Sequence, residues 1–123
     1  MISKIKYWIP AILFMATIFL LSSRPAPEEL KHFPIIAKLK LVHIIEYGIL
    51  YLLVRYAIKR TTSYNKLEMF YLALMITILY GLTDEFHQIY VVSRTAKLED
   101  AIANGVGGLL AQAGIGLSGK FRR

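Results

Sequence analysis

The chain has 123 residues, of which 56% are hydrophobic, and it carries a formal net charge of +7 and no cysteine. The absence of cysteine excludes disulfides and cysteine-ligated metal sites. A mean hydropathy of +0.50 exceeds that of an ordinary soluble domain, and the apolar residues lie in long blocks. Basic residues lie at the ends of these blocks, which favours membrane topology over nucleic-acid binding. We therefore expect a membrane protein with no nucleic-acid partner.

The first apolar block predicts a membrane span over residues 7–23. Two lysines precede it, and no charged residue follows until Arg24. The block is just long enough to cross a bilayer. A cleaved signal peptide is the alternative, but Leu20 and Leu21 stand where a cleavage site requires small residues. We therefore expect a retained first span.

A second span is predicted over residues 39–58, and polar side chains recur along it. Lys40, His43 and Glu46 follow one another at intervals of three residues, and Tyr47 lies four residues after His43. In a helix these residues share one face about 120° wide. A polar face on a membrane helix requires a polar partner or a function.

The third and fourth spans are predicted over residues 69–90 and 100–118, with further polar residues at their adjoining ends. These residues are Asp84, Glu85, His87, Gln88, Asp100 and Asn104. Arg94 lies in the loop between the two spans. The predicted fold is therefore all-α: one domain over residues 1–123, built as an integral membrane four-helix bundle.

Basic residues orient this bundle. Nine of them fall on the side that holds both termini and six fall on the other side. Cytoplasmic loops carry the excess of Lys and Arg, so we expect both termini in the cytoplasm.

This topology brings polar residues of three spans to one depth. The second and fourth spans enter the membrane from outside and the third ends there, so their polar faces meet in the outer half. A charged side chain costs roughly 2.5–3.5 kcal/mol at the centre of a bilayer on insertion scales, and less near the interface. We expect these side chains to face one another around a polar cavity.

Three interpretations of this cluster remain open. It could be a structural network in which Lys40 and Arg94 neutralise the carboxylates, although buried ionic groups are a poor source of stability alone. It could hold a divalent metal, because His43 with Glu46 and Asp84 with His87 are i,i+3 pairs of the kind used in di-metal bundles; this spacing is common by chance, so metal is not favoured. It could also perform general acid–base chemistry through its histidines.

Two other kinds of site are not supported. Ser93 follows no recognisable nucleophile turn, so a Ser-His-Asp triad is not predicted. The glycines of 105–108 lack the Lys-Ser/Thr ending of a phosphate loop and lie in an apolar span.

Several of these segments together resemble the VanZ-like family of small bacterial membrane proteins. The resemblance covers roughly residues 8–117 and departs from the family pattern at Leu39 and at Val92-Ser93. It rests on Leu21-Ser22-Ser23 followed by prolines, Lys40-x-x-His43-x-x-Glu46-Tyr47, Tyr80-Gly81-Leu82-Thr83-Asp84-Glu85-Phe86-His87-Gln88, Arg94, Asp100, Asn104 and Gly107-Gly108.

The resemblance implies a role at the bacterial cell envelope, in the cytoplasmic membrane. The founding member of that family accompanies glycopeptide-resistance genes and contributes to teicoplanin resistance. The resemblance also strengthens the expectation that the polar cluster is a site, without deciding between an enzyme and a binding protein.

We therefore expect a site for an anionic membrane lipid or a lipid-linked precursor. The expected catalytic residues are His43, Glu46, Asp84, Glu85 and His87. The expected substrate-binding residues are Lys40, Tyr47, Gln88, Arg94, Asp100 and Asn104. The alternative is a non-catalytic accessory protein in which the same cluster is a structural network.

Overall fold

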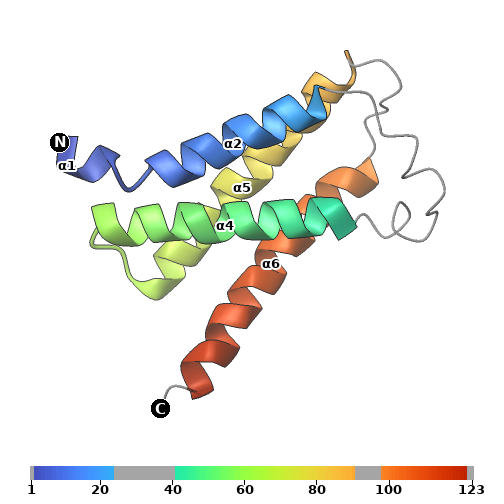
Figure 1. The fold of residues 1–123 in the computed structure, drawn as a ribbon. Helices are drawn as coiled ribbons and strands as arrows, with labels where there is room; N and C mark the ends of the chain where they lie inside the picture. The colour runs from blue at the N-terminus through green and yellow to red at the C-terminus, as the bar shows by residue number, and fades with distance from the viewer. Residues whose placement is uncertain (1, 24–40, 91–97, 122–123) are drawn as a thin grey trace.

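The computed structural model describes residues 2–23, 41–90 and 98–121, and within these ranges the chain is helical, with no strand (Figure 1). This confirms the predicted all-α class. The helices are α1 (Ile2–Ile5), α2 (Ile9–Ser22), α4 (Leu41–Thr61), α5 (Lys66–Gln88) and α6 (Leu98–Phe121).

Local sequence explains where two of these helices begin. Pro10 lies in the first turn of α2, where its missing backbone donor removes no intrahelical bond. Before α5, the Asn65 side chain accepts from the Glu68 backbone N–H at 2.8 Å, and Glu68 Oε2 accepts from the Asn65 N–H at 2.9 Å. This capping box satisfies two backbone donors, so α5 begins at Lys66, before the apolar run that starts near Met69.

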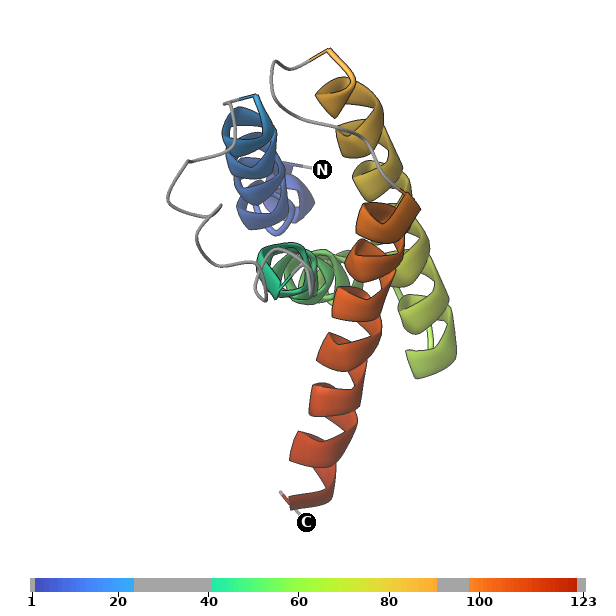
Figure 2. The ribbon, with the colours of Figure 1, turned by 90° about the vertical axis from the view of Figure 1, so that its right-hand side faces the viewer.

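Helix α4 lies at the centre of the fold and contacts each of the other three long helices. In Figure 2, where α4 is seen nearly end-on, α2 lies on one side of it and α5 and α6 on another. Fully buried side chains follow one another along α4, namely Tyr47, Leu50, Tyr51, Val54, Ala57 and Ile58. The core is therefore organised around this one helix.

Two side-chain hydrogen bonds between helices show how the helices are oriented relative to one another. Trp8, before α2, donates its indole N–H to Thr61 Oγ1 at the end of α4 (3.3 Å), so these two helices are antiparallel. Tyr80 of α5 donates its hydroxyl to the Met15 carbonyl of α2. The ends of α2 and α5 and the beginnings of α4 and α6 therefore lie at one end of the bundle, which we call the site end.

Helices α4 and α6 approach closely at two glycines. A Cβ atom built on Gly107 would lie 2.3 Å from the Ile44 carbonyl oxygen, and one built on Gly48 would lie 3.2 Å from the Gly107 oxygen. Only glycine leaves room for backbone-to-backbone contact at this distance, as in small-xxx-small packing. This crossing sets how far Asn104, one turn earlier on α6, reaches into the bundle.

One described helix is long and apolar enough to cross a membrane, over Lys66–His87 in α5. Two shorter apolar helices cover Ile9–Leu21 and Ala101–Leu117. Helix α4 spans 21 residues, but it carries Glu46 and Arg55 between its apolar side chains. The helices thus occupy the four predicted segments, while the four-span membrane topology itself remains a prediction.

Candidate functional site

The described structure places seven predicted site residues with their side chains, all near the site end. These are His43, Glu46 and Tyr47 on α4, Asp84, Glu85 and His87 on α5, and Asn104 on α6. Gln88 and Asp100 belong to helices α5 and α6, but their side chains are outside the described part. Lys40 and Arg94 lie outside the described residues altogether.

Tyr47 and Asp84 join α4 to α5 at the centre of this group. The Tyr47 hydroxyl donates to Asp84 Oδ2 at 3.1 Å, and the two residues are 0% and 3% exposed. The other carboxyl oxygen, Oδ1, is buried and has no hydrogen-bond partner among the described residues. An acceptor in this position is available to a water molecule or to a ligand that carries a donor.

Asn104 of α6 reaches the same region from the third helix. A Cβ atom built on Gly81 would lie 2.7 Å from Asn104 Nδ2 and 3.2 Å from Tyr47 Cε1. The amide therefore lies against α5 and the Tyr47 ring, one helical turn before Asp84. We call Tyr47, Asp84 and Asn104 the buried junction.

The amide of Asn104 is the least satisfied polar group of the buried junction. The residue is 0% exposed, and neither Oδ1 nor Nδ2 has a hydrogen-bond partner within the described ranges. Such an amide costs about 1–3 kcal/mol on the scale of protein mutational data. Stability alone does not account for this residue.

The remaining described acidic and histidine side chains near the site end differ in burial. Glu85 is buried, whereas His43 and Glu46 are half-buried on α4. Glu85 directly follows Asp84, so two adjacent residues of α5 carry buried carboxyl groups. Carboxylates buried in this way require hydrogen bonds, cations or water to remain charged.

The imidazole of His87 is held by the end of α2. Its ring stacks on Phe19, with the ring centres 4.3 Å apart and the planes inclined by 23°. Its Nε2 lies 3.4 Å from Ser23 Oγ. A fourth helix therefore contributes to the site, whereas the sequence pattern indicated polar faces on three.

Hydrogen bonding at Ser23 assigns the protons of His87. Ser23 Oγ donates its only proton to the Phe19 carbonyl at 2.8 Å, so toward the imidazole it can only accept. Nε2 then carries the hydrogen, and in the neutral ring the lone pair lies on Nδ1. That nitrogen is buried and has no hydrogen-bond partner among the described residues. His87 thus has an acceptor nitrogen suited to receive a proton.

Polar groups further from the site end than the buried junction mostly have hydrogen-bond partners. Tyr51 donates its hydroxyl to Gln112 Oε1, linking α4 to α6. Thr77 is buried and donates to the Ala73 carbonyl at 2.8 Å within α5. Unpartnered acceptors and donors therefore gather near the site end, although Arg55 Nε, further along α4, also has no partner in the described part of the chain.

No group of three or more His, Asp or Glu side chains converges on one point within residues 2–23, 41–90 and 98–121. Two i,i+3 pairs were proposed from the sequence. The His43–Glu46 pair lies on α4 and the Asp84–His87 pair lies on α5. Described side chains alone do not form a metal centre.

Three residues that contact the candidate site residues were not among the predicted site residues, although Ser23 and Gly81 belong to motifs that carry the family resemblance. Ser23 and Phe19 position His87, and Gly81 leaves the space that Asn104 occupies. Ser23 could have been included, because the first predicted span ends there, at the same level as the polar ends of the other spans. No sequence signal pairs Gly81 with Asn104, since this contact depends on the rotation of α6.

Comparisons with known proteins bear on the whole chain. No curated protein and no solved structure is significantly similar to it. A family model described as VanZ/LLP1 matches residues 7–117, which cover nearly the whole chain and include every predicted site residue. The match confirms the resemblance drawn from the sequence motifs, and the chain belongs to the VanZ/LLP1 family.

Proposed function

We propose that this protein is a multi-pass membrane protein of the bacterial cell envelope whose site end binds and modifies an anionic, lipid-linked molecule. The observation that carries the proposal is the buried junction, in which three helices bring together a tyrosine, a carboxyl group and an amide that has no hydrogen-bond partner among the described residues. Groups buried in this way are costly to retain without a ligand.

Exposed apolar side chains support membrane insertion. Large apolar residues are exposed on every long helix, among them Leu13, Leu52, Leu79 and Leu110. Exposed apolar surface on every helix would drive association of a soluble protein, whereas lipid tails cover such surface in a membrane. Four spans with both termini in the cytoplasm put the site end at the outer leaflet.

Single cysteines test this topology, because the natural chain has none. A cysteine at Ala26 or Ala96 should react with an impermeant maleimide on intact cells. A cysteine at Ser63, which is exposed between α4 and α5, should react only after the membrane is opened. The reverse labelling would overturn the orientation.

The ligand class follows from the charges that flank the site end in sequence. Lys40 directly precedes α4, and Arg94 and Lys97 lie between α5 and α6. Arginine binds phosphate through two parallel hydrogen bonds and lysine as a point charge. A phospholipid headgroup or an undecaprenyl-linked precursor, entering sideways from the outer leaflet, would place its phosphate at this level.

The groups beneath the phosphate then supply acid–base chemistry. His87 Nδ1 is an available acceptor that can take a proton from water or from a hydroxyl group of the ligand. The Asp84 carboxyl, held by Tyr47, can accept a second hydrogen bond through Oδ1. The favoured activity is therefore modification or hydrolysis of the lipid next to its phosphate. Membership of the VanZ/LLP1 family supports the envelope setting and a contribution to glycopeptide (teicoplanin) resistance.

A non-catalytic accessory protein is the second candidate, and the buried Tyr47–Asp84 hydrogen bond favours it. This bond joins two helices, as a structural network would. In that case the protein would shield or present the lipid without changing it. A small-ion pathway is less well supported, because the hydroxyl of Thr77 and the amide oxygen of Gln112 below the junction are already engaged.

One experiment separates these functions. Purified protein is incubated with extracted envelope lipids, and the lipids are compared by mass spectrometry for wild type, Glu46→Gln, Asp84→Asn and Arg94→Ala. Glu68→Gln is the matched control, since it makes the same charge change at the other end and glutamine keeps the capping box.

Each result has a distinct meaning. A product that requires Glu46 and Asp84 but survives Glu68→Gln supports the enzyme. Lipid that co-purifies with wild type and is lost in Arg94→Ala, with no product in any sample, supports the accessory protein. If wild-type protein neither retains nor alters an anionic lipid, the ligand assignment fails.

A further inference from the structure

The end of the bundle opposite the site end holds two cations against one aromatic ring. The Lys6 ammonium lies 5.1 Å from the centre of the Tyr7 ring, and the Arg60 guanidinium carbon lies 4.8 Å from it. Arg60 Nη2 also donates to the Tyr7 hydroxyl at 3.1 Å. We call Lys6, Tyr7 and Arg60 the basic cluster.

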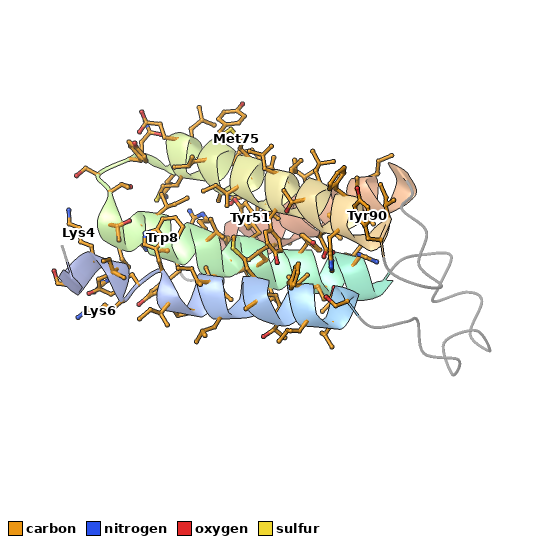
Figure 3. The ribbon with its side chains drawn as sticks, turned by 90° about the horizontal axis from the view of Figure 1, so that it is seen from above. Lys4, Lys6, Trp8, Tyr51, Met75 and Tyr90 are labelled. Carbon is orange, nitrogen blue, oxygen red and sulfur yellow. The ribbon has the colours of Figure 1, made fainter. Side chains whose placement is uncertain are left out.

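Packing around Tyr7 holds the basic cluster between the residues that precede α2 and the end of α4. Trp8 donates to Thr61 at the end of α4 (3.3 Å), and the Tyr7 ring packs edge-on against Tyr56 with the ring centres 6.1 Å apart. Tyr7 therefore takes part in a packed, hydrogen-bonded contact between the residues that precede α2 and the end of α4. Figure 3 shows Lys4, Lys6 and Trp8 at this end and Tyr90 at the other.

The positive charge of the basic cluster is not neutralised by the described part of the protein. No carboxylate is paired with Lys6 or Arg60 within residues 2–23, 41–90 and 98–121, and the groups that act on Arg60 are tyrosines. Glu68, the acid nearest in sequence to this end, is engaged with the backbone of Asn65. Exposed lysines at 4, 59 and 66 add further positive charge.

We propose that the basic cluster binds the phosphate of an anionic phospholipid headgroup. Arg60 supplies planar guanidinium donors, which match phosphate oxygens, and Lys6 supplies a second charge close by. A phosphate bound to Arg60 would reduce the repulsion between two cations that are both held near one ring. A headgroup with a choline cation would meet that same repulsion, so phosphatidylglycerol should bind better than phosphatidylcholine.

The surroundings of the basic cluster indicate a lipid rather than free phosphate. Ile5 and Ile9, on either side of Tyr7 in sequence, are 53% and 47% exposed. Leu13, one turn further along α2, is 63% exposed. Exposed apolar side chains next to the basic cluster can contact the acyl chains of a lipid whose headgroup the cluster binds, as at membrane interfaces.

The test measures lipid binding by purified full-length protein in neutral detergent. Bound lipid is counted by native mass spectrometry after titration with phosphatidylglycerol or phosphatidylcholine, and inorganic phosphate is added as a competitor. We expect selective binding of phosphatidylglycerol that millimolar phosphate does not displace. Arg60→Gln should weaken this binding by more than about tenfold, as expected for loss of charged hydrogen bonds.

Two control variants separate a site from general charge and from folding. Lys66→Gln removes one positive charge at the same end and should weaken binding by no more than about fivefold, the effect of one cation near a membrane surface. Tyr7→Phe removes the hydrogen bond from Arg60 but keeps the ring and both cations, so it should bind phosphatidylglycerol as wild type does.

Four outcomes would overturn the proposal. Equal binding of both phospholipids would show that the basic cluster does not select an anionic headgroup. Displacement by inorganic phosphate would show that the basic cluster binds free phosphate and not a lipid. An equal loss in Lys66→Gln would show general charge rather than a site. A loss in Tyr7→Phe as large as in Arg60→Gln would show that the cluster only holds the two helices together. Phosphatidylglycerol bound at the site end would be retained by Arg60→Gln, so a loss in that variant reports on the basic cluster and not on the candidate function at the site end.

Discussion

The Tyr47 hydroxyl donates to Asp84 Oδ2 at 3.1 Å across the interface of α4 and α5, and both residues are buried. Tyr47 lies beside Asn104 of α6 through the space that Gly81 leaves open. One tyrosine thus connects the central helix to a carboxyl group and to an amide, and the geometry of the site depends on it.

Tyr47→Phe should destabilise the protein. The substitution leaves Asp84 Oδ2 buried without its donor, which costs about 1–3 kcal/mol. Reversible unfolding in mixed micelles measures the change. Tyr71→Phe is the control, because Tyr71 is exposed and should be neutral. Equal stability of Tyr47→Phe and wild type would show that water replaces the phenol and that the junction is hydrated.

Gly107→Ala should weaken the contact between α4 and α6. The new methyl group would lie 2.3 Å from the Ile44 carbonyl oxygen, a backbone atom that cannot move aside without separating the helices. We expect a loss of about 1–3 kcal/mol, together with loss of ligand binding, because the shift moves Asn104.

Gly114→Ala on the same helix is the matched control for that substitution. A Cβ atom at Gly114 meets nothing within 4 Å among the described residues, so alanine should be neutral or gain about 0.5–1 kcal/mol in helix propensity. Equal effects at the two positions would show that propensity, and not close packing, decides the stability of α6.

Helix positions could largely be predicted from the sequence, and their ends could not. Apolar runs mark the part of a helix that lipid can cover, whereas backbone hydrogen bonding decides where the helix stops. The predicted third span began at residue 69, but the Asn65–Glu68 capping box starts α5 at Lys66. Likewise α4 continues to Thr61, past the predicted end at residue 58, because basic residues continue a helix beyond its apolar part.

Helical spacing predicted which polar residues lie near the site end, but it did not predict their contacts. Spacing placed His43 and Tyr47 on one face of α4, and topology brought that face to the level of Asp84 and Asn104. Which atoms meet depends on how each helix is rotated and how closely it packs. The stack of His87 on Phe19 follows from such packing, and no local pattern in either helix encodes it.

The neutral imidazole of His87 should carry its hydrogen on Nε2. Ser23 Oγ gives its proton to the Phe19 carbonyl and can only accept from the ring. Nitrogen-15 NMR of labelled protein distinguishes the two tautomers, and His87→Gln assigns the signal. Ser23→Ala should produce a mixture of tautomers, and Ser23→Thr, which keeps the hydroxyl, should restore the Nε2–H form.

A hydrogen on Nδ1 in wild-type protein would contradict this assignment. His87 would then need an acceptor outside the described residues, and Nε2 would become the nitrogen that receives a proton. Phe19→Leu provides a second check, because it removes the stacked ring but leaves the Ser23 contact. It should broaden the His87 signal without changing which nitrogen is protonated.

Asn104→Leu should stabilise the protein and abolish its function. The side chain is fully buried, and both of its polar atoms lack partners within the described part of the chain. Leucine fills a similar volume without burying an amide, so the free energy of unfolding should rise by about 1–3 kcal/mol. Ligand retention or turnover should be lost, the trade-off expected where a residue is kept for activity at a cost in stability.

Gln112→Leu is the comparison that makes the Asn104 result decisive. Gln112 is an amide on the same helix, but it accepts a hydrogen bond from Tyr51, so its replacement leaves a tyrosine hydroxyl without an acceptor and should destabilise the protein. A site residue and a structural residue thus shift the unfolding free energy in opposite directions. If Asn104→Leu also destabilises the protein, and function declines only in proportion, the buried junction is a structural network and the accessory role is the better account of this family member.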